Sequence, residues 1–172
     1  MFTGIVQELG SVTSLLETES GFSLEVVVKK EFIAGLSKGA SVAVNGCCLT
    51  VTKFNETRIS FDVIKETIRI TNLGSLELQH KVNLERSLKF GDEIGGHVLS
   101  GHVSCAASAV LRNQEGEKEL IITCPREWRK YIIHKGYVAV NGASLTVAKV
   151  SQEGFSVFLI PETLSSTNLS LI

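Results

Sequence analysis

Two short segments of this chain each place a thiol or hydroxyl group two residues before a threonine. The first, VAVNGCCLTV, contains Cys48 and Thr50. The second, VAVNGASLTV, contains Ser144 and Thr146. Side chains two residues apart in a strand share a face, so each segment predicts a shallow polar surface that offers hydrogen bonds to a ligand. The alternative is that all four are ordinary half-exposed strand residues.

Two histidines in the segment GGHVLSGHVS, His97 and His102, are candidates for proton transfer, because histidine titrates near neutral pH. In the internal repeat described below, Ile5 stands opposite His102, and His97 has no counterpart. A difference confined to one copy favours a role that the other copy lacks; the alternative is a surface or linker histidine. No Cys, Asp or Glu pattern nearby completes a set of metal ligands.

Acidic residues near the ends of strands are further candidates. Asp62 shares the polar face of RISFDVI with Ser60, and its counterpart is Phe158. It is either the polar wall of a pocket or a solvated strand residue. Glu66 and Glu162 each begin a predicted helical turn, where a carboxylate is a common first-turn residue, so we expect a structural role for both.

An internal repeat organises the chain. When the sequence is shifted by 96 residues, 16 of the 32 positions in 42–73 match those in 138–169 without a gap. Self-similarity over this distance indicates two copies of one structural unit. We expect an N-terminal unit at residues 1–96 and a C-terminal unit at 97–172, with KFGDEIGG, residues 89–96, as the linker.

Each unit has the sequence of a small β-barrel. Its predicted strands are rich in Val, Ile, Thr and Phe, and in the first unit they span 23–29, 41–45, 47–54 and 58–64. Short helical turns are expected near 31–36, 66–72 and 126–133. Many short strands with hairpin signals favour an all-β fold, a tandem pair of antiparallel barrels.

Asn45-Gly46 and Asn141-Gly142 predict the turns of two β-hairpins, since a type I′ turn needs positive φ at both central residues. A two-residue turn places Ala43 opposite Cys48. The core face of the first hairpin is then apolar and carries Val42, Val44, Cys47, Leu49 and Val51. Its outer face carries Ser41, Ala43, Cys48 and Thr50; the outer face of the second carries Lys135, Tyr137, Ala139, Ser144 and Thr146.

The composition excludes several classes of protein. Lys and Arg total 17 against 18 Asp and Glu, for a net charge of −1, so there is no electrostatic footprint for nucleic acid or an anionic membrane. No apolar run approaches the roughly 20 residues of a membrane span, and MFTGIVQELG lacks the features of a secretory signal. The four cysteines form no C-x-x-C motif, so free thiols in a reducing cytoplasm are expected.

Six motifs in unbroken order resemble the riboflavin synthase family of the α-chain type. They are MFTGIV at 1–6, NGCCLTV at 45–51, DVIKET at 62–67, GDEIGGH with SGHV at 91–103, NGASLTV at 141–147 and LIPET at 159–163. The resemblance covers essentially the whole chain and includes the duplication. It implies two six-stranded antiparallel Greek-key barrels followed by a C-terminal helix.

The resemblance also implies a reaction. Members of the family convert two molecules of 6,7-dimethyl-8-ribityllumazine into riboflavin and 5-amino-6-ribitylaminouracil by four-carbon transfer, the last step of riboflavin biosynthesis, without a cofactor or metal. Each barrel binds one lumazine, and the active site forms where the N-terminal barrel of one subunit meets the C-terminal barrel of another in a homotrimer. The resemblance further suggests a cytoplasmic enzyme with lumazine synthase as a partner.

Matching motifs carry the family's ligand contacts onto this chain. For an N-terminal pocket they are Gly4, Ile5, Val6, Ser41, Cys48, Leu49, Thr50, Asp62, Val63, Ile64, Lys65, Glu66 and Thr67. For a C-terminal pocket they are Gly101, His102, Val103, Lys135, Ser144, Leu145, Thr146, Ile160, Pro161, Glu162 and Thr163, and His97 is a further candidate contact.

A dismutation gives a chemical reason for the repeat, because it uses two identical substrates in opposite roles. We expect His102 to assist removal of a proton from the 7-methyl group. Cys48, a hydroxyl such as that of Ser144 or Thr146, or water would supply the nucleophile. Holding the two rings in place would provide much of the acceleration, on the order of 7–11 kcal/mol at best.

The sequence departs from the family at its end. The first copy continues into KVNLERSL, residues 81–88, whereas the second stops three residues after Leu169. The family's final strand and C-terminal helix are therefore missing, and an unpaired sheet edge is expected. Other functions stay open: a non-catalytic lumazine- or flavin-binding protein, the flavin-binding barrel of a reductase, or a purely structural barrel pair. A reductase needs a nucleotide-binding partner domain, for which the chain is too short.

Overall fold

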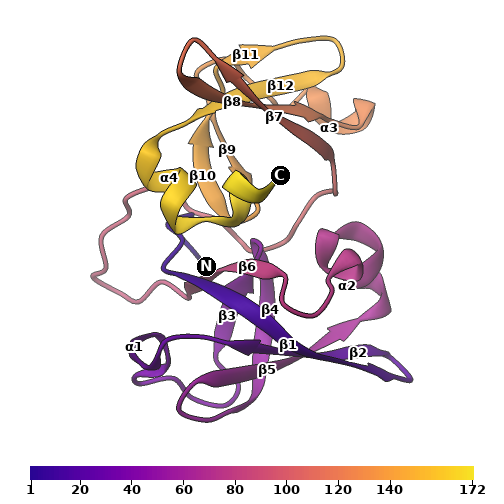
Figure 1. Ribbon diagram of the computed structural model, residues 1–172, viewed down its shortest axis with the longest axis vertical. Coiled ribbons are helices and arrows are strands. Elements are labelled where there is room, and N and C mark those ends of the chain that lie inside the picture. Colours follow the sequence, from indigo (N-terminus) through magenta and orange to yellow (C-terminus); the bar gives the residue numbers. More distant parts are fainter.

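The computed structural model describes residues 1–172 as two β units joined end to end (Figure 1). The N-terminal unit, indigo to magenta, lies below the C-terminal unit, orange to yellow, and the N-terminus lies between them. The chain has no helix that is long and apolar enough to cross a membrane. The all-β architecture that the sequence predicts is confirmed.

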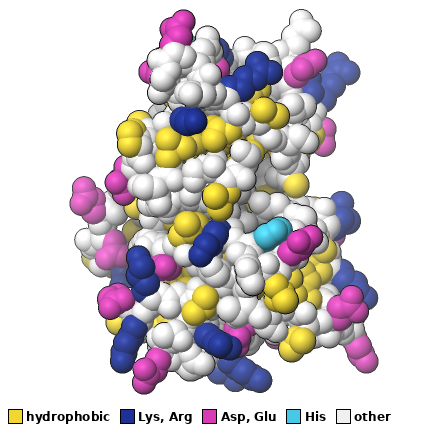
Figure 2. Space-filling model, in the orientation of Figure 1, with side chains coloured by type: hydrophobic (Ala, Val, Ile, Leu, Met, Phe, Trp, Pro, Cys, Tyr) yellow, Lys and Arg dark blue, Asp and Glu magenta, His cyan; other side chains and the backbone are white.

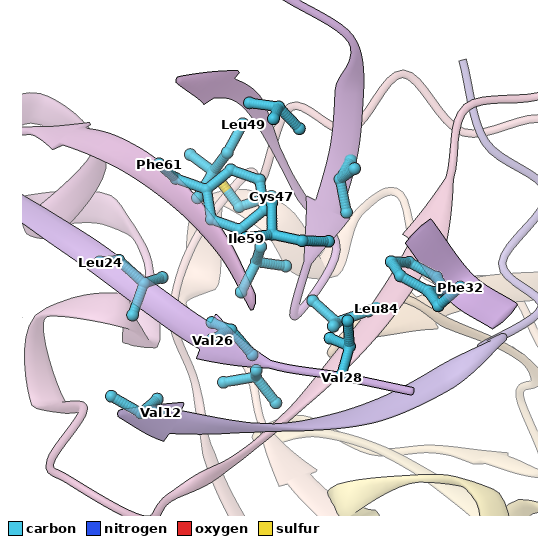
Figure 3. Close-up of a cluster of buried hydrophobic side chains, with 14 of the residues drawn as sticks. Val12, Leu24, Val26, Val28, Phe32, Cys47, Leu49, Ile59, Phe61 and Leu84 are labelled. Carbon is cyan, nitrogen blue, oxygen red and sulfur yellow. The ribbon is translucent and has the colours of Figure 1, made fainter. Parts of the chain in front are cut away.

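The N-terminal unit is a closed antiparallel barrel with strand order β1-β2-β5-β4-β3-β6. Its strands are β1 (Glu8–Thr18), β2 (Gly21–Val27), β3 (Ser41–Val44), β4 (Cys47–Phe54), β5 (Arg58–Ile64) and β6 (Lys81–Arg86). Its short helices are α1 (Lys30–Ile33), α2 (Lys65–Ile70) and the 3-10 turn η1 (Asn72–Ser75). Eighteen buried residues fill the barrel, with Leu24, Ile59 and Phe61 fully enclosed (Figure 3).

The C-terminal unit repeats this plan but is open. Its strands are β7 (Ser108–Gln114), β8 (Glu117–Thr123), β9 (Tyr137–Val140), β10 (Ala143–Thr146), β11 (Lys149–Val150) and β12 (Gly154–Leu159). Its helices are α3 (Arg126–Arg129), α4 (Pro161–Ser166) and the 3-10 turn η2 (Asn168–Leu171). The strands form one sheet of order β11-β12-β8-β7 and a separate pair β10-β9. Strands β7 and β9 each lack a neighbour on one side, so the unpaired sheet edge that the sequence predicts is present.

The open side of the C-terminal unit leaves its interior accessible. A cavity of about 550 Å³ reaches from Ala109 and Val140 to Trp128. Val138 and Val140, the counterparts of the core residues Val42 and Val44, are therefore only half-buried. The C-terminal core contains 10 buried residues against 18 in the closed barrel, so it has less apolar burial to stabilise it.

Both hairpins have the register that the sequence predicts. Ala43 lies opposite Cys48 in the first, and Ala139 opposite Ser144 in the second. Asn45 and Asn141 each have φ of 47°, and the glycine that follows each has φ of 81°, as a type I′ turn requires.

The two hairpin turns meet tip to tip where the units touch. A Cβ atom added to Gly46 would lie 2.7 Å from the backbone nitrogen of Gly142. Four amide side chains from both copies close a ring of hydrogen bonds at this contact, namely Asn45, Asn72, Asn141 and Asn168. The repeat therefore builds a pseudo-symmetric joint from matching residues.

Candidate functional site

The segments that begin the two units cross between them. Phe2 and Leu99 exchange a pair of backbone hydrogen bonds of 2.8 and 2.9 Å. Beyond this bridge each segment continues to the hairpin of the other unit. The backbone nitrogen of Cys48 donates to the carbonyl of Gly101, and that of Ser144 donates to the carbonyl of Gly4, both at 2.8 Å.

This exchange corrects the grouping of residues into pockets. The sequence assigned Gly4–Val6 to the same pocket as Cys48, and Gly101–Val103 to the same pocket as Ser144. The structure places Gly101 against Cys48 and Gly4 against Ser144. The grouping implied by the resemblance is wrong because matching motifs identify equivalent segments but do not show which hairpin each segment reaches.

The candidate N-terminal pocket is the outer face of β3 and β4. Cys48 is half-buried there, Thr50 is exposed, and Ser41 lies opposite Thr50. Strands β4 and β5 align Val51 with Phe61, so one step further along each strand Asp62 lies beside Thr50. These side chains form the polar surface that the alternation predicts.

Gly101 closes one side of the N-terminal pocket. It has φ of +81°, and an added Cβ would lie 2.6 Å from Cβ of Cys48 and 2.7 Å from the ring of Phe2. Only glycine fits this backbone and this approach. His102 follows directly; its side chain is exposed and makes no hydrogen bond. It adjoins the candidate N-terminal pocket and also lines the cavity that reaches into the C-terminal unit.

The C-terminal pocket contains a histidine–serine pair. Nδ1 of His97 lies 2.6 Å from Oγ of Ser144, and the imidazole packs against the ring of Tyr137 with centroids 4.3 Å apart. Partial burial lowers the pKa of His97 below its usual value, so the imidazole is neutral at pH 7. Thr146 is exposed and lies opposite Tyr137 in the hairpin.

The segments that follow β5 and β12 are equivalent in the two units. Residues 64–67 and 160–163 turn from a strand into α2 and α4, and most of their side chains are exposed. Glu66 forms two hydrogen bonds with Arg69, of 2.9 and 2.6 Å, which lower the pKa of the Glu66 carboxyl. Lys135 is exposed with φ of 62°.

Three predicted contact residues point into the core. The side chains of Leu49, Val63 and Leu145 are at most 8% exposed and belong to the apolar clusters. Only their backbones are available to a ligand. The chain contains no group of three or more His, Cys, Asp or Glu side chains that could hold a metal ion.

Two buried polar residues of β6 could not be identified from the sequence, and one of them holds a crossing segment. Glu85 is 3% exposed and accepts hydrogen bonds from Thr3 and Gly4. Asn83, 1% exposed, donates to the carbonyl of Asn141 and accepts from the backbone of Asn168. Alternation along β6 suggests a solvated face for Asn83 and Glu85, but Asn83 contacts the C-terminal unit and Glu85 contacts the N-terminal segment.

Comparison with known proteins finds the same two repeated units. The family model described as the lumazine binding domain matches residues 3–87 and again residues 100–172. Riboflavin synthase of Escherichia coli K12 is 45% identical over 171 residues, which cover 98% of this chain and 80% of that protein. Riboflavin synthase of Chlamydia pneumoniae is 46% identical over 169 residues, with 98% and 83% covered. That of Schizosaccharomyces pombe is 38% identical over 168 residues, with 96% and 80% covered.

Solved structures show the same fold. A crystal structure of LumP complexed with riboflavin has a TM-score of 0.89 and 28% identity, and covers all of this chain and 94% of that chain. A structure of LumP complexed with 6,7-dimethyl-8-(1'-D-ribityl) lumazine also gives a TM-score of 0.89, at 24% identity, with 100% and 93% covered. The duplicated lumazine-binding domain and the extent of the sequence identity place the chain in the riboflavin synthase family.

Proposed function

We propose that this protein is a riboflavin synthase, a transferase that converts two molecules of 6,7-dimethyl-8-ribityllumazine into riboflavin and 5-amino-6-ribitylaminouracil. The observation that carries the proposal is the pair of related pockets on one chain. Each pocket presents a thiol or hydroxyl and a threonine beside Gly101 or Gly4, the glycine of a segment that crosses between the units. The curated relatives at 45% and 46% identity are riboflavin synthases.

The reaction is balanced without an added oxidant or reductant. One lumazine gives up a four-carbon unit and becomes the uracil; the other receives it and becomes riboflavin. A base removes a proton from a 7-methyl group, and the carbanion attacks the partner ring while a nucleophile adds to one of the two rings. We assign proton transfer to His102 and addition to Cys48, water or the hydroxyl of Ser144 or Thr146.

We further propose a cytoplasmic homotrimer in which pockets of adjacent subunits face each other, with units at 1–96 and 97–172 and lumazine synthase as a partner. All four cysteines are free, which suits a reducing compartment. Apolar side chains reach the surface of both units (Figure 2). Ile64 is 54% exposed at the first pocket, and Tyr137 and Ile160 are 73% and 62% exposed at the second, so each pocket has an apolar rim that a second copy could cover.

Incubation of the purified protein with lumazine alone tests the proposed function. We expect one riboflavin and one 5-amino-6-ribitylaminouracil for every two lumazines consumed, measured by chromatography. Binding of lumazine without formation of riboflavin would instead identify a non-catalytic binding protein of the same fold. His102→Gln should bind lumazine normally and turn over slowly; unchanged turnover would exclude this histidine as an essential base.

A further inference from the structure

Glu85, on β6 of the closed barrel, is a buried carboxylate that the proposed chemistry does not use. Its Oε1 accepts hydrogen bonds from the backbone nitrogen and the hydroxyl of Thr3, at 2.6 and 2.7 Å. Its Oε2 accepts from the backbone nitrogen of Gly4 at 3.0 Å. The side chain forms no salt bridge within 4.0 Å.

An ionised carboxylate in such a place is stable only if hydrogen-bond donors replace the water it has lost. Here all three donors come from one short peptide, Thr3–Gly4, at the start of the chain. Charge-assisted hydrogen bonds are stronger than neutral ones, so Glu85 fixes both the position and the orientation of this peptide. Free N-terminal segments are otherwise poorly ordered.

The peptide that Glu85 holds continues directly into the C-terminal pocket. The carbonyl of Thr3 accepts from the backbone nitrogen of His97 at 2.9 Å, and the carbonyl of Gly4 accepts from that of Ser144 at 2.8 Å. His97 and Ser144 are then joined through their side chains at 2.6 Å. A hydrogen-bonded path therefore runs from β6 of one unit to the hydroxyl of Ser144 in the other.

Close packing leaves this path little freedom. A Cβ atom added to Gly96 would lie 2.2 Å from the carbonyl oxygen of Thr3 and 2.8 Å from Cβ of Ser144. A Cβ on Gly4 would lie 2.7 Å from Cβ of Ser144. A shift of the Thr3–Gly4 peptide must therefore move His97, Ser144 or both.

We propose that Glu85 is a positioning residue of the C-terminal pocket, which acts from the N-terminal barrel through Thr3 and Gly4 on the His97–Ser144 pair. The inference rests on the proposed function insofar as it concerns lumazine. In this proposal a residue of the N-terminal barrel holds the residues of the C-terminal pocket in position. The side chain of Glu85 forms hydrogen bonds with Thr3 and Gly4 alone, so it acts through this peptide and not by a hydrogen bond to Ser144.

Two pairs of variants test this role. Glu85→Gln keeps the shape of the side chain but replaces one accepting oxygen by an amide NH2 group, which then faces an N–H donor. Its control is Glu117→Gln, the same change at an exposed carboxylate. Thr3→Val removes the hydroxyl that donates to Glu85 and accepts from the backbone nitrogen of Ile5, and Thr3→Ser keeps this hydroxyl. The lost charge-assisted bond should weaken lumazine binding at one of the two sites about tenfold and leave the other site unchanged in a fluorescence titration.

A second measurement needs no ligand. The imidazole proton resonances of His97 should shift in Glu85→Gln and Thr3→Val, and match wild type in Thr3→Ser and Glu117→Gln. Unchanged His97 signals in Thr3→Val and Glu85→Gln would overturn the proposal, as would equal loss of both lumazine sites with a lowered melting temperature. If wild type binds no lumazine but the His97 signals shift, the proposed function fails and the positioning role stands.

Discussion

Cys47 and Cys48 are adjacent in the chain but lie in opposite environments. Cys47 points into the barrel core, and burial raises the pKa of its thiol to about 11 with a smaller contribution from Cys48. Cys48 is half-buried on the outer face against Gly101. The second copy has Ala143 in place of the first thiol and Ser144 in place of the second, so it keeps a polar group only on the pocket side.

A thiol-modifying reagent should therefore distinguish the two cysteines. At pH 8 iodoacetamide should modify Cys48 well before Cys47, because the thiolate is the reactive form and Cys47 is held protonated. Mass spectrometry of peptides from Cys48→Ser, the matched control, should show almost no labelling at this segment. Faster labelling of Cys47 in the native protein would contradict the assignment of faces.

The environment of His97 predicts a pH dependence of stability. Its pKa in the folded protein is lowered by burial, so between that value and about 6.5 the unfolded chain binds a proton that the folded chain does not. The contribution of neutral His97 to the free energy of unfolding is therefore fully present above about pH 6.5. It is lost as the pH falls towards the pKa of His97 in the folded protein. Denaturation with urea should show a smaller loss between pH 7 and 5 for His97→Gln; an equal loss would count against this effect.

At the scale of secondary-structure elements, the two hairpins contribute both to the fold and to the candidate site. Their turns, registers and faces follow from Asn-Gly and from strict alternation, so all three could be predicted from the sequence. The crossing of Gly4 and Gly101 could not, because the Phe2–Leu99 bridge is a contact between distant residues. For the same reason the burial of Glu85 could not be predicted, since alternation describes one strand and not the distant Thr3–Gly4 peptide that contacts Glu85.

Gly46 tests the tip-to-tip contact of the hairpin turns. Gly46→Ala should lower the free energy of unfolding by about 1–2 kcal/mol, because alanine disfavours the left-handed backbone conformation at this position. The substitution would also force the new Cβ against Gly142. Gly39→Ala is a matched control, because Gly39 has φ of +87° but nothing within 4 Å of an added Cβ. Urea denaturation should show the larger loss for Gly46→Ala, and equal losses would mean that the turns do not press together.

At the scale of the whole molecule, the ring of four asparagines joins the two units. Nδ2 of Asn72 donates to Oδ1 of Asn141 at 2.9 Å, and Nδ2 of Asn168 donates to Oδ1 of Asn45 at 3.1 Å. The ring closes through two further bonds of 3.3 Å. Each amide both donates and accepts, so the loss of one leaves two neighbours without a partner.

Removal of one amide should therefore weaken the joint. Asn72→Ala should cost about 1–3 kcal/mol, since buried polar groups lose their partners, and the two units should then unfold in separate calorimetric transitions. Asn113→Ala, at an exposed residue of β7 without a side-chain hydrogen bond, serves as the control. A single unshifted transition for Asn72→Ala would show that the ring does not couple the units.

The central claim is that each half of this chain binds one ribityllumazine. Equilibrium dialysis with a 6,7-dioxo analogue, which lacks the reactive methyl groups and cannot turn over, measures this most directly. The pockets at Cys48 and Ser144 predict two analogue molecules bound per chain, and about tenfold weaker binding at one of the two sites in Glu85→Gln. Saturation at one molecule per chain, or no binding, would contradict the account.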